Sequence, residues 1–228
     1  MGKIIVIEGL DGTGKETQTM QLYKNLKSEG KNVHKISFPK YDSRSSELVK
    51  MYLSGEIAGE GTDLNPYMCS SFYAADRAIQ YYMHFKNEYE QEDSIIIADR
   101  YISANIIHQG GKIESVSKRE EFYLWTYDYE VGKLGIPKPD ITIVLRIPPW
   151  KSRELLNKRY NGEEKKKDVH EKNLEYLDAC DKIIDEATMV LNNNGHKWVQ
   201  VNCLDGSNNL RTIEDIAYEI KSIVQDIL

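Results

Sequence analysis

A glycine-rich loop lies between a strongly predicted strand and a strongly predicted helix near the start of the chain. Ile4 to Ile7 is a continuous β-branched run, which is typical of a strand buried on both faces of a parallel sheet. Gly9 to Lys15 then reads G-x-x-x-x-G-K, and residues 16–28 have the pattern of a helix closed by Gly30. Glycines at a helix start let successive backbone N–H groups surround phosphate oxygens. This order confines the chain to α/β folds with a phosphate-binding loop at a strand end.

The rest of the chain continues the alternation of strands and helices. Further strands are predicted over 33–38, 94–98, 141–147 and 198–202. Helices are predicted over 45–53, 66–89, 118–133 and 212–227, and two more flank a charged stretch at 161–168. Strands that alternate with helices form βαβ units. We therefore expect one domain over 1–228, with three layers and a five-stranded parallel sheet flanked by helices.

Composition and charge limit the classes of partner. The 228 residues carry a formal net charge of -6, which argues against a broad basic surface for nucleic acid. Cys69, Cys180 and Cys203 are far apart and odd in number, as expected for reduced thiols. The chain starts directly with a strand, and no apolar stretch approaches the ~20 residues of a membrane span. We expect a cytoplasmic protein with no membrane or nucleic-acid partner.

The loop itself supplies the candidate phosphate ligands. These residues are Gly9, Asp11, Gly12, Thr13, Gly14, Lys15, Glu16 and Thr17. Lys15 would reach the β- and γ-phosphates of ATP as a mobile point charge. Glu16 occupies the position where such loops usually carry a hydroxyl that binds Mg²⁺, and a helix turns about 100° per residue, so Thr17 cannot replace it. Either Glu16 supplies an oxygen to Mg²⁺, or phosphates, waters and Asp99 hold the metal; the second arrangement is preferred.

Asp99-Arg100-Tyr101 follows the buried strand at 94–98. Ligands in open α/β sheets gather outside the carboxyl ends of the strands. Asp99 can hold a water of Mg²⁺, and Arg100 can bind a phosphate with two parallel hydrogen bonds. The alternative is a structural ion pair, but the phosphate loop nearby favours the functional interpretation.

Four motifs together resemble the thymidylate kinase family. They are Glu8 to Lys15, Phe38 to Tyr41, Tyr73 to Arg77, and Asp99 to Tyr101 with Asn105 and Gln109-Gly110. The resemblance implies a P-loop kinase fold, with ATP as phosphoryl donor, Mg²⁺ as cofactor and dTMP as acceptor. It also implies direct in-line transfer of the γ-phosphoryl group to form dTDP, in a homodimeric enzyme.

The same resemblance assigns the acceptor site. Asp11 would contact the sugar 3′-hydroxyl, and Tyr41 and Arg100 would hold the phosphate. Tyr73 would stack on thymine and Arg77 would bond to it, and these two are four apart, on one helix face. The further acceptor residues are Phe38, Asn105, His108 and Gln109. The alternative for Tyr73 and Arg77 is a core aromatic and a surface cation.

The resemblance also concerns the catalytic cations. Some members of the family carry an arginine inside the loop, where this chain has Gly12, and others supply arginines from a mobile lid. The lid would span about 153–168, with Arg153 and Arg159 as its catalytic residues beside Lys15 and Arg100. Leu204, Asp205 and Gly206 would border the adenine, or form a plain turn. Arg146 has no role in this scheme.

Two other functions remain open from the sequence. One is a kinase of the same fold with another acceptor, either a deoxynucleoside or a different monophosphate. The other is a catalytically weak nucleotide-binding protein, which the unusual Glu16 and Arg146 would fit. The aromatic helix from Phe122 to Tyr129 would either form a dimer interface or pack against the sheet.

Overall fold

Five parallel strands form a single sheet in the order β2-β3-β1-β4-β5. The computed structural model describes residues 1–57, 64–159 and 174–228, with the backbone alone at 158, 159 and 174. The strands are β1 (Lys3–Gly9), β2 (Asn32–Ser37), β3 (Ser94–Asp99), β4 (Ile141–Arg146) and β5 (Trp198–Asn202). In the centre of the sheet, Ile5 of β1 is paired with Ile97 of β3 on one side and Ile141 of β4 on the other. The predicted parallel sheet is confirmed.

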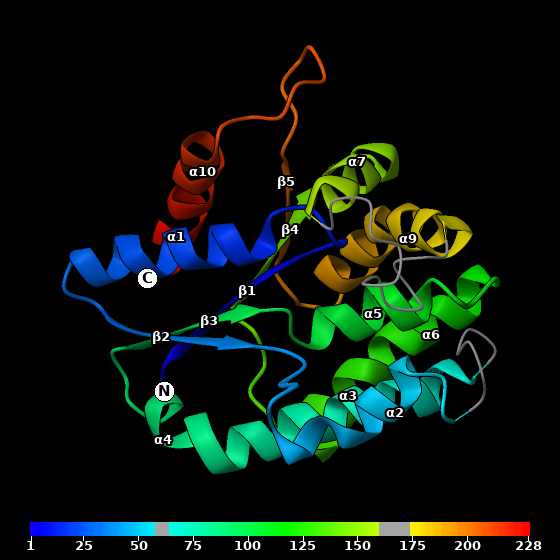
Figure 1. Cartoon of the computed structure of the whole chain (residues 1–228). Coiled ribbons are helices and arrows are strands. Elements are labelled where there is room, and N and C mark those ends of the chain that lie inside the picture. The colour runs from blue at the N-terminus through cyan, green and yellow to red at the C-terminus, as the bar shows by residue number, and fades with distance from the viewer. Residues whose placement is uncertain (58–63, 160–173) are drawn as a thin grey trace.

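Helices cover both faces of this sheet (Figure 1). They are α1 (Lys15–Ser28), α2 (Glu47–Leu53), α3 (Pro66–Gln80), α4 (Lys86–Tyr89), α5 (Ile102–Gly110), α6 (Val116–Tyr127), α7 (Pro149–Arg159), α9 (Leu174–Asn193) and α10 (Ile213–Gln225). The described residues also form the 3₁₀ turn η1 (Arg44–Ser46) and the π-helical segments η2 (Tyr81–Phe85) and η3 (Asp128–Lys133). Helices α1 and α10 pack on one face, and α5, α6 and α9 pack on the other.

The helices start largely where the sequence predicts. Asn65 accepts a hydrogen bond from the Tyr67 backbone N–H at 2.8 Å and Pro66 opens α3, as the Asn-Pro pair predicts. The predicted helix over 66–89 is built from α3, η2 and α4 in succession, and the one over 118–133 from α6 and η3. Helix α5 was not predicted as an element, because nine residues hold too few turns for a clear 3.6-residue period.

The strands are apolar throughout because two cores meet them. Ile5 and Ile7 face the core that contains α1 and α10, whereas Ile4 and Val6 face the core of α5, α6 and α9. A side-chain period of two residues then requires apolar residues at every position of the strand. Phe122 of α6 is fully buried in the second core, so this end of the aromatic helix packs inside the domain.

Every strand ends at the same edge of the sheet, since all pairings are parallel. The loops after β1, β3 and β4 are therefore neighbours, because these three strands are adjacent in the sheet. This edge carries the phosphate loop and the Asp99-Arg100 pair. Within the described residues, no helix is long and apolar enough to cross a membrane.

Candidate active site

The loop after β1 is shaped by three glycines with positive φ. Gly9, Gly12 and Gly14 have φ values of 146°, 82° and 87°, which side chains with a Cβ rarely adopt. The Thr13 hydroxyl donates to the Leu10 carbonyl at 2.8 Å and closes the loop internally. Gly14 then caps α1, so unpaired N–H groups of the first helical turn face the loop. The backbone of this loop therefore has the conformation that an anion-binding site requires.

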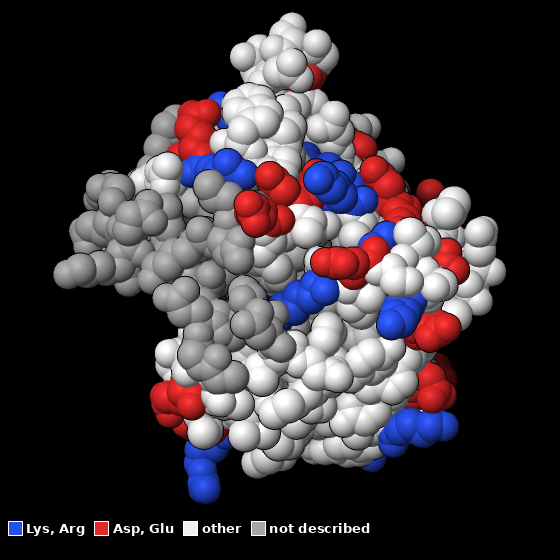
Figure 2. Space-filling model, turned by 90° about the vertical axis from the view of Figure 1, so that its right-hand side faces the viewer, with Lys and Arg blue, Asp and Glu red and all other residues white. Residues whose placement is uncertain are grey.

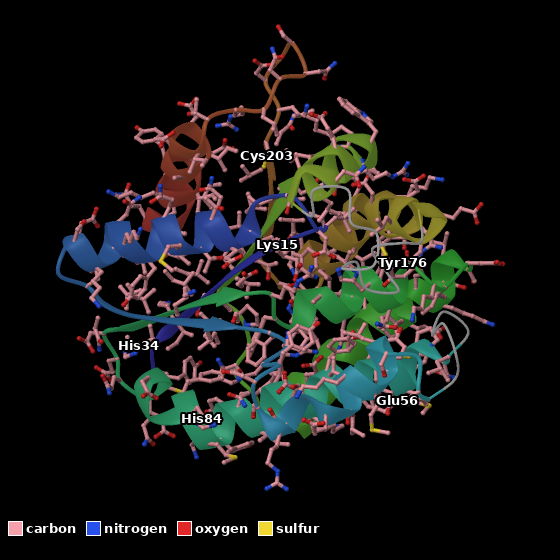
Figure 3. All side chains as sticks on the ribbon, in the orientation of Figure 1. Lys15, His34, Glu56, His84, Tyr176 and Cys203 are labelled. Carbon is pink, nitrogen blue, oxygen red and sulfur yellow. The ribbon has the colours of Figure 1, made fainter. Side chains whose placement is uncertain are left out.

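Lys15 is the first residue of α1 and lies near the middle of the molecule (Figure 3). Its side chain is buried, and Nζ donates to the Leu10 carbonyl at 2.9 Å and lies 3.5 Å from the Asp11 carboxylate. Burial and the nearby charge of Arg100 lower the pKa of Lys15, although Asp11 and Glu8 oppose the shift. An incoming phosphate would offer this ammonium a stronger acceptor than a carbonyl.

Arg100 lies opposite Lys15 across Asp11. Its guanidinium is bonded to the Asp11 carboxylate, and Nη1 lies 2.7 Å from His108 Nε2 and 3.8 Å from the Glu8 carboxylate. Burial alone would lower the pKa of Arg100, but the charges of Asp11 and Glu8 raise it above the usual range. Burial would likewise raise the pKa of Asp11, but Arg100 and Lys15 hold it well below its ordinary value. Two cations thus share one carboxylate.

Arg100 also has a strained backbone, with a φ of 64°. A non-glycine residue in the left-handed region costs free energy, and such strain gathers at functional sites where the surroundings enforce it. The enforcement is visible here: the Arg100 N–H donates to the Ile7 carbonyl of β1 at 3.1 Å, and the guanidinium is anchored on Asp11. The strained corner directs the side chain toward the phosphate loop.

Glu8 is a site residue to which sequence reasoning gave no role. Its carboxylate is fully buried and accepts hydrogen bonds from the Gly9 N–H at 3.0 Å and the Ser103 hydroxyl at 2.8 Å. Burial raises the pKa of Glu8, while Arg100 and Lys15 oppose the shift. A carboxyl in an otherwise solid apolar strand was the signal that could have identified it.

The residues considered for Mg²⁺ lie on either side of Lys15. Asp99 ends β3, and burial raises its pKa against the opposing charge of Lys15. Glu16 and Thr17 are exposed on the first turn of α1. Among the described residues, no three His, Cys, Asp or Glu side chains cluster tightly enough to enclose a metal. One or two carboxylates fit Mg²⁺, which keeps several waters and phosphate oxygens as ligands.

Helices α3 and α5 form the second half of the candidate site. The Tyr73 ring meets the Tyr52 ring edge-on at 6.2 Å between centroids. Arg77, one turn further along α3, is buried and bound through Nε and Nη2 to both carboxylate oxygens of Glu130, at 2.6 and 2.7 Å. Asn105 of α5 donates to the same carboxylate at 2.9 Å. The structure brings Arg77 and Asn105 together, and Glu130 of η3 was not foreseen.

His108 also lies at this side, between two other residues. Besides Arg100, it meets Tyr176 of α9, whose hydroxyl donates to the His108 carbonyl at 2.7 Å and whose ring stacks on the imidazole. Tyr176, at the start of α9, is a second site residue that the sequence did not reveal (Figure 3). Gln109 is buried, and its Oε1 has no hydrogen-bond partner among the described residues.

The two aromatic residues of the predicted phosphate side differ in exposure. Tyr41, in the loop after β2, is 50% exposed and close enough to Arg100 to contribute to the raised pKa of that residue. Phe38, predicted to bind the acceptor, is 6% exposed and packs against Phe85 and Tyr101 in the core. Phe38 therefore supports the loop after β2 from the core side.

Helix α7 is seated directly on the phosphate loop. A Cβ built on Gly12 would lie 2.9 Å from the Ser152 carbonyl oxygen and 3.1 Å from Leu156 Cγ, and the Ser152 hydroxyl bonds to the Asp11 carbonyl. This packing explains physically why the loop carries no arginine at position 12. Arg153, a predicted lid residue, is bound to Asp178 of α9 at 3.1 Å. The Arg159 side chain and the rest of the predicted lid to 168 lie outside the described residues.

The loop after β5 forms a hairpin. Leu204 is buried and bridges Leu210, and the Asp205 carboxylate accepts bonds from the N–H groups of Ser207 and Asn209 at 2.8 Å each. Asp205 thus organises the turn, and Gly206 is exposed within it.

Arg146, which had no role from the sequence, has a structural one. Its guanidinium lies 3.2 Å from Asp181 and 3.1 Å from Asp185 of α9. It also donates to Gln200 of β5 at 3.0 Å. Arg146 therefore links the end of β4 to β5 and to α9.

Figure 2 shows one face of the molecule, on which lysines and arginines are interspersed with acidic side chains. On the described part of this face the cations form no broad patch. Three cations of the site already contact carboxylates: Lys15 and Arg100 contact Asp11, and Arg153 contacts Asp178.

Comparisons with known proteins agree with this geometry. The family model described as thymidylate kinase matches residues 7–201. The chain is 28% identical to a thymidylate kinase of Mycobacterium tuberculosis over 70% of this chain and 71% of the relative. It is 29% identical to a probable thymidylate kinase of Sulfurisphaera tokodaii over 89% and 97%, and 33% identical to a thymidylate kinase of Halothermothrix orenii over 67% and 68%. Since the family match spans most of the chain, the chain belongs to the thymidylate kinase family of enzymes.

Proposed function

We propose that this chain transfers the γ-phosphoryl group of ATP to dTMP and releases dTDP and ADP. The observation that carries the proposal is the cluster of Lys15, Arg100 and Asp11 at the mouth of the glycine loop. It sets two cations beside a preformed anion cradle, and in-line phosphoryl transfer needs mainly alignment and charge neutralisation.

The donor side rests on the loop. Its N–H groups and Lys15 would hold the β- and γ-phosphates of ATP. Mg²⁺, when bound near Asp99, would neutralise part of the phosphate charge and orient the γ-phosphoryl group. A phosphate oxygen of dTMP is itself the nucleophile, so no side chain has to attack. The hairpin with Leu204, Asp205 and Gly206 would border the adenine.

The acceptor side rests on Arg100 and on the polar and aromatic side chains of α3 and α5. Arg100 would hold the dTMP phosphate together with Tyr41, and Asp11 would then be free to accept the sugar 3′-hydroxyl. Tyr73 would stack on the base, because an aromatic face gives a flat apolar platform. Arg77, Asn105 and Gln109 would contact the base edge, and His108 would lie near the deoxyribose.

Arginines of the lid would supply the remaining positive charge around the transferring phosphoryl group. Arg153 is bound to Asp178 and would have to exchange this partner for the transferring phosphoryl group as the lid closes. Arg159 is the second lid cation of the proposal. Closure would exclude water and suppress ATP hydrolysis.

A cytoplasmic homodimer completes the proposal. Phe122 is buried, so an interface would use the outer side chains of this region, such as Tyr67, Met68 and Leu124, which are 36%, 43% and 40% exposed. The Tyr67 ring meets the rings of Phe122 and Trp125, so exposed apolar side chains of α3 and α6 lie near one another and would suit a second copy of the chain. A light-scattering mass of about twice 26.3 kDa is expected.

The test is a coupled assay of ADP release with ATP, Mg²⁺ and a panel of acceptors. We expect dTMP to be phosphorylated and thymidine to be inert, since a nucleoside offers Arg100 no phosphate. Lys15→Ala should lower the rate by at least about a hundredfold, as the loss of one charge-stabilising donor does. Lys24→Ala, on the exposed side of the same helix, is the matched control and should keep full activity. Tight ATP binding without turnover in the unaltered chain would refute the proposal.

A further inference from the structure

Glu130 is a buried carboxylate outside the predicted site. It is 0% exposed, and it lies in the π-helical segment η3 that continues α6. Both of its oxygens are occupied by Arg77, and one of them also accepts from the Asn105 amide. π-Helical turns within longer helices are frequent at functional sites.

A purely stabilising role explains this carboxylate poorly. Removing two opposite charges from water costs about as much as their attraction returns, so an apolar pair of similar size is often as stable. Arg77 is 1% exposed and Asn105 is 2% exposed, so both are almost completely removed from water. An arrangement that gains little stability but fixes two polar side chains indicates a positioning role.

The hydrogen bonds define which way the Asn105 amide points. Its Nδ2 donates to the Glu130 carboxylate at 2.9 Å and to the Ser70 carbonyl at 3.1 Å. Both partners are acceptors only, so the amide nitrogen must face them and Oδ1 must face away. Within the described residues, Oδ1 of Asn105 and Nη1 of Arg77 keep no hydrogen-bond partner. One acceptor and one donor are left on the side of the network away from Glu130.

This pair of groups has a definite complement among pyrimidines. Thymine and uracil present an N3–H donor beside the O4 acceptor, whereas cytosine presents an N3 acceptor beside an amino group at C4. We infer that Glu130 is a positioning residue that orients Asn105 and Arg77 so that the pocket accepts 4-keto pyrimidine monophosphates and rejects the 4-amino one. The inference rests on the proposed function and names the origin of its base selectivity.

The experiment compares kcat/KM for dTMP and dCMP in the unaltered chain and in Glu130→Gln, Asn105→Ala and the double variant. Glu130→Gln introduces an amide that donates as well as accepts, so Asn105 is no longer held in one orientation. The ratio of kcat/KM for dTMP to kcat/KM for dCMP should fall at least about tenfold, mostly through a higher KM for dTMP. In the Asn105→Ala background, Glu130→Gln should change the ratio less than in the unaltered chain, because the part of the effect that passes through Asn105 is already lost and only the part through Arg77 remains.

Glu186→Gln is the matched control, because Glu186 of α9 likewise binds an arginine, Arg119, with two hydrogen bonds of 2.9 and 2.6 Å, but bonds neither Arg77 nor Asn105. It should leave the ratio unchanged. If Glu130→Gln lowers the activity on both acceptors equally, the role of Glu130 is structural and the inference fails. If that variant does not fold, Asn105→Ala decides: an unchanged ratio overturns the inference. A chain that never phosphorylates dTMP refutes the proposed function instead.

Discussion

The packing of α7 against the phosphate loop can be tested by a pair of glycine substitutions. Gly12 and Gly14 have nearly the same φ, +82° and +87°, but different surroundings. A Cβ on Gly12 would meet the Ser152 carbonyl oxygen at 2.9 Å, whereas a Cβ on Gly14 would have nothing within 4 Å. Gly12→Ala and Gly14→Ala therefore share the backbone strain and differ only in the collision with α7.

The magnitudes follow from these two contributions. The left-handed backbone should cost each variant about 1–2 kcal/mol in the free energy of unfolding. The collision at position 12 involves a backbone atom that cannot rotate away, so Gly12→Ala should lose a further ~1–3 kcal/mol, as overpacked sites do. Urea unfolding without nucleotide measures both values. Hydrogen exchange should also show faster opening of α7 amides in Gly12→Ala alone.

Equal destabilisation of the two variants would refute this reasoning, because it would mean that α7 does not rest on the loop in solution. A larger loss in Gly14→Ala would contradict it further. The same experiment bears on the proposed lid, since α7 carries Arg153 and the position of α7 relative to the loop determines where that cation can reach.

Three further predictions concern stability and acceptor binding. Burial lowers the pKa of His196 from 6.5 to about 4, and its ring lies against the ring of Tyr127. The stability that neutral His196 contributes should therefore be complete above pH 6.5 and lost toward pH 4. Because His196 is only partly buried, His196→Gln should remove about 1–2 kcal/mol of the pH dependence measured by urea unfolding at pH 5 and 7.5. Arg146→Gln should lower the unfolding free energy by about 1–2 kcal/mol with kcat unchanged, because it leaves Asp181 and Asp185 without their cation. An unchanged melting temperature would count against this prediction. Tyr73→Leu should raise the KM for dTMP by about 5- to 100-fold, because stacking on the base is lost. Initial-rate kinetics measures this change, and an unchanged KM would exclude stacking on Tyr73.

The sequence predicted the sheet well because the strands carry their own signal. Ile4 to Ile7 and Ile95 to Ile97 are β-branched at every position, and only a parallel sheet covered on both faces buries such runs completely. The glycine loop was equally clear, since its spacing, the preceding strand and the following helix define one local conformation. These features depend on neighbours within a few residues.

The parts that the sequence left out depend on contacts between distant residues. Glu130 meets Arg77 across 53 positions, and Ser152 meets Asp11 across 141. Neither contact leaves a periodic pattern, because a single glutamate on an aromatic helix is indistinguishable from a solvated one. Helix α5 was missed for a different reason: it is short, and its isoleucines resemble a strand as much as a helix.

Asp11 acts as an internal counter-ion for Lys15 and Arg100, and this changes how nucleotides must bind. A phosphate that arrives at either cation replaces a carboxylate already in contact, so binding is an exchange of partners more than a release of small ions into solvent. The affinity for nucleotide should therefore depend on salt more weakly than the number of cations touching phosphate would suggest. In the proposed function the exchange would also order events, because Asp11 would become available to the sugar hydroxyl only after the acceptor phosphate has drawn Arg100 away. One carboxylate would thereby link the cation proposed for the donor, Lys15, to the cation proposed for the acceptor, Arg100.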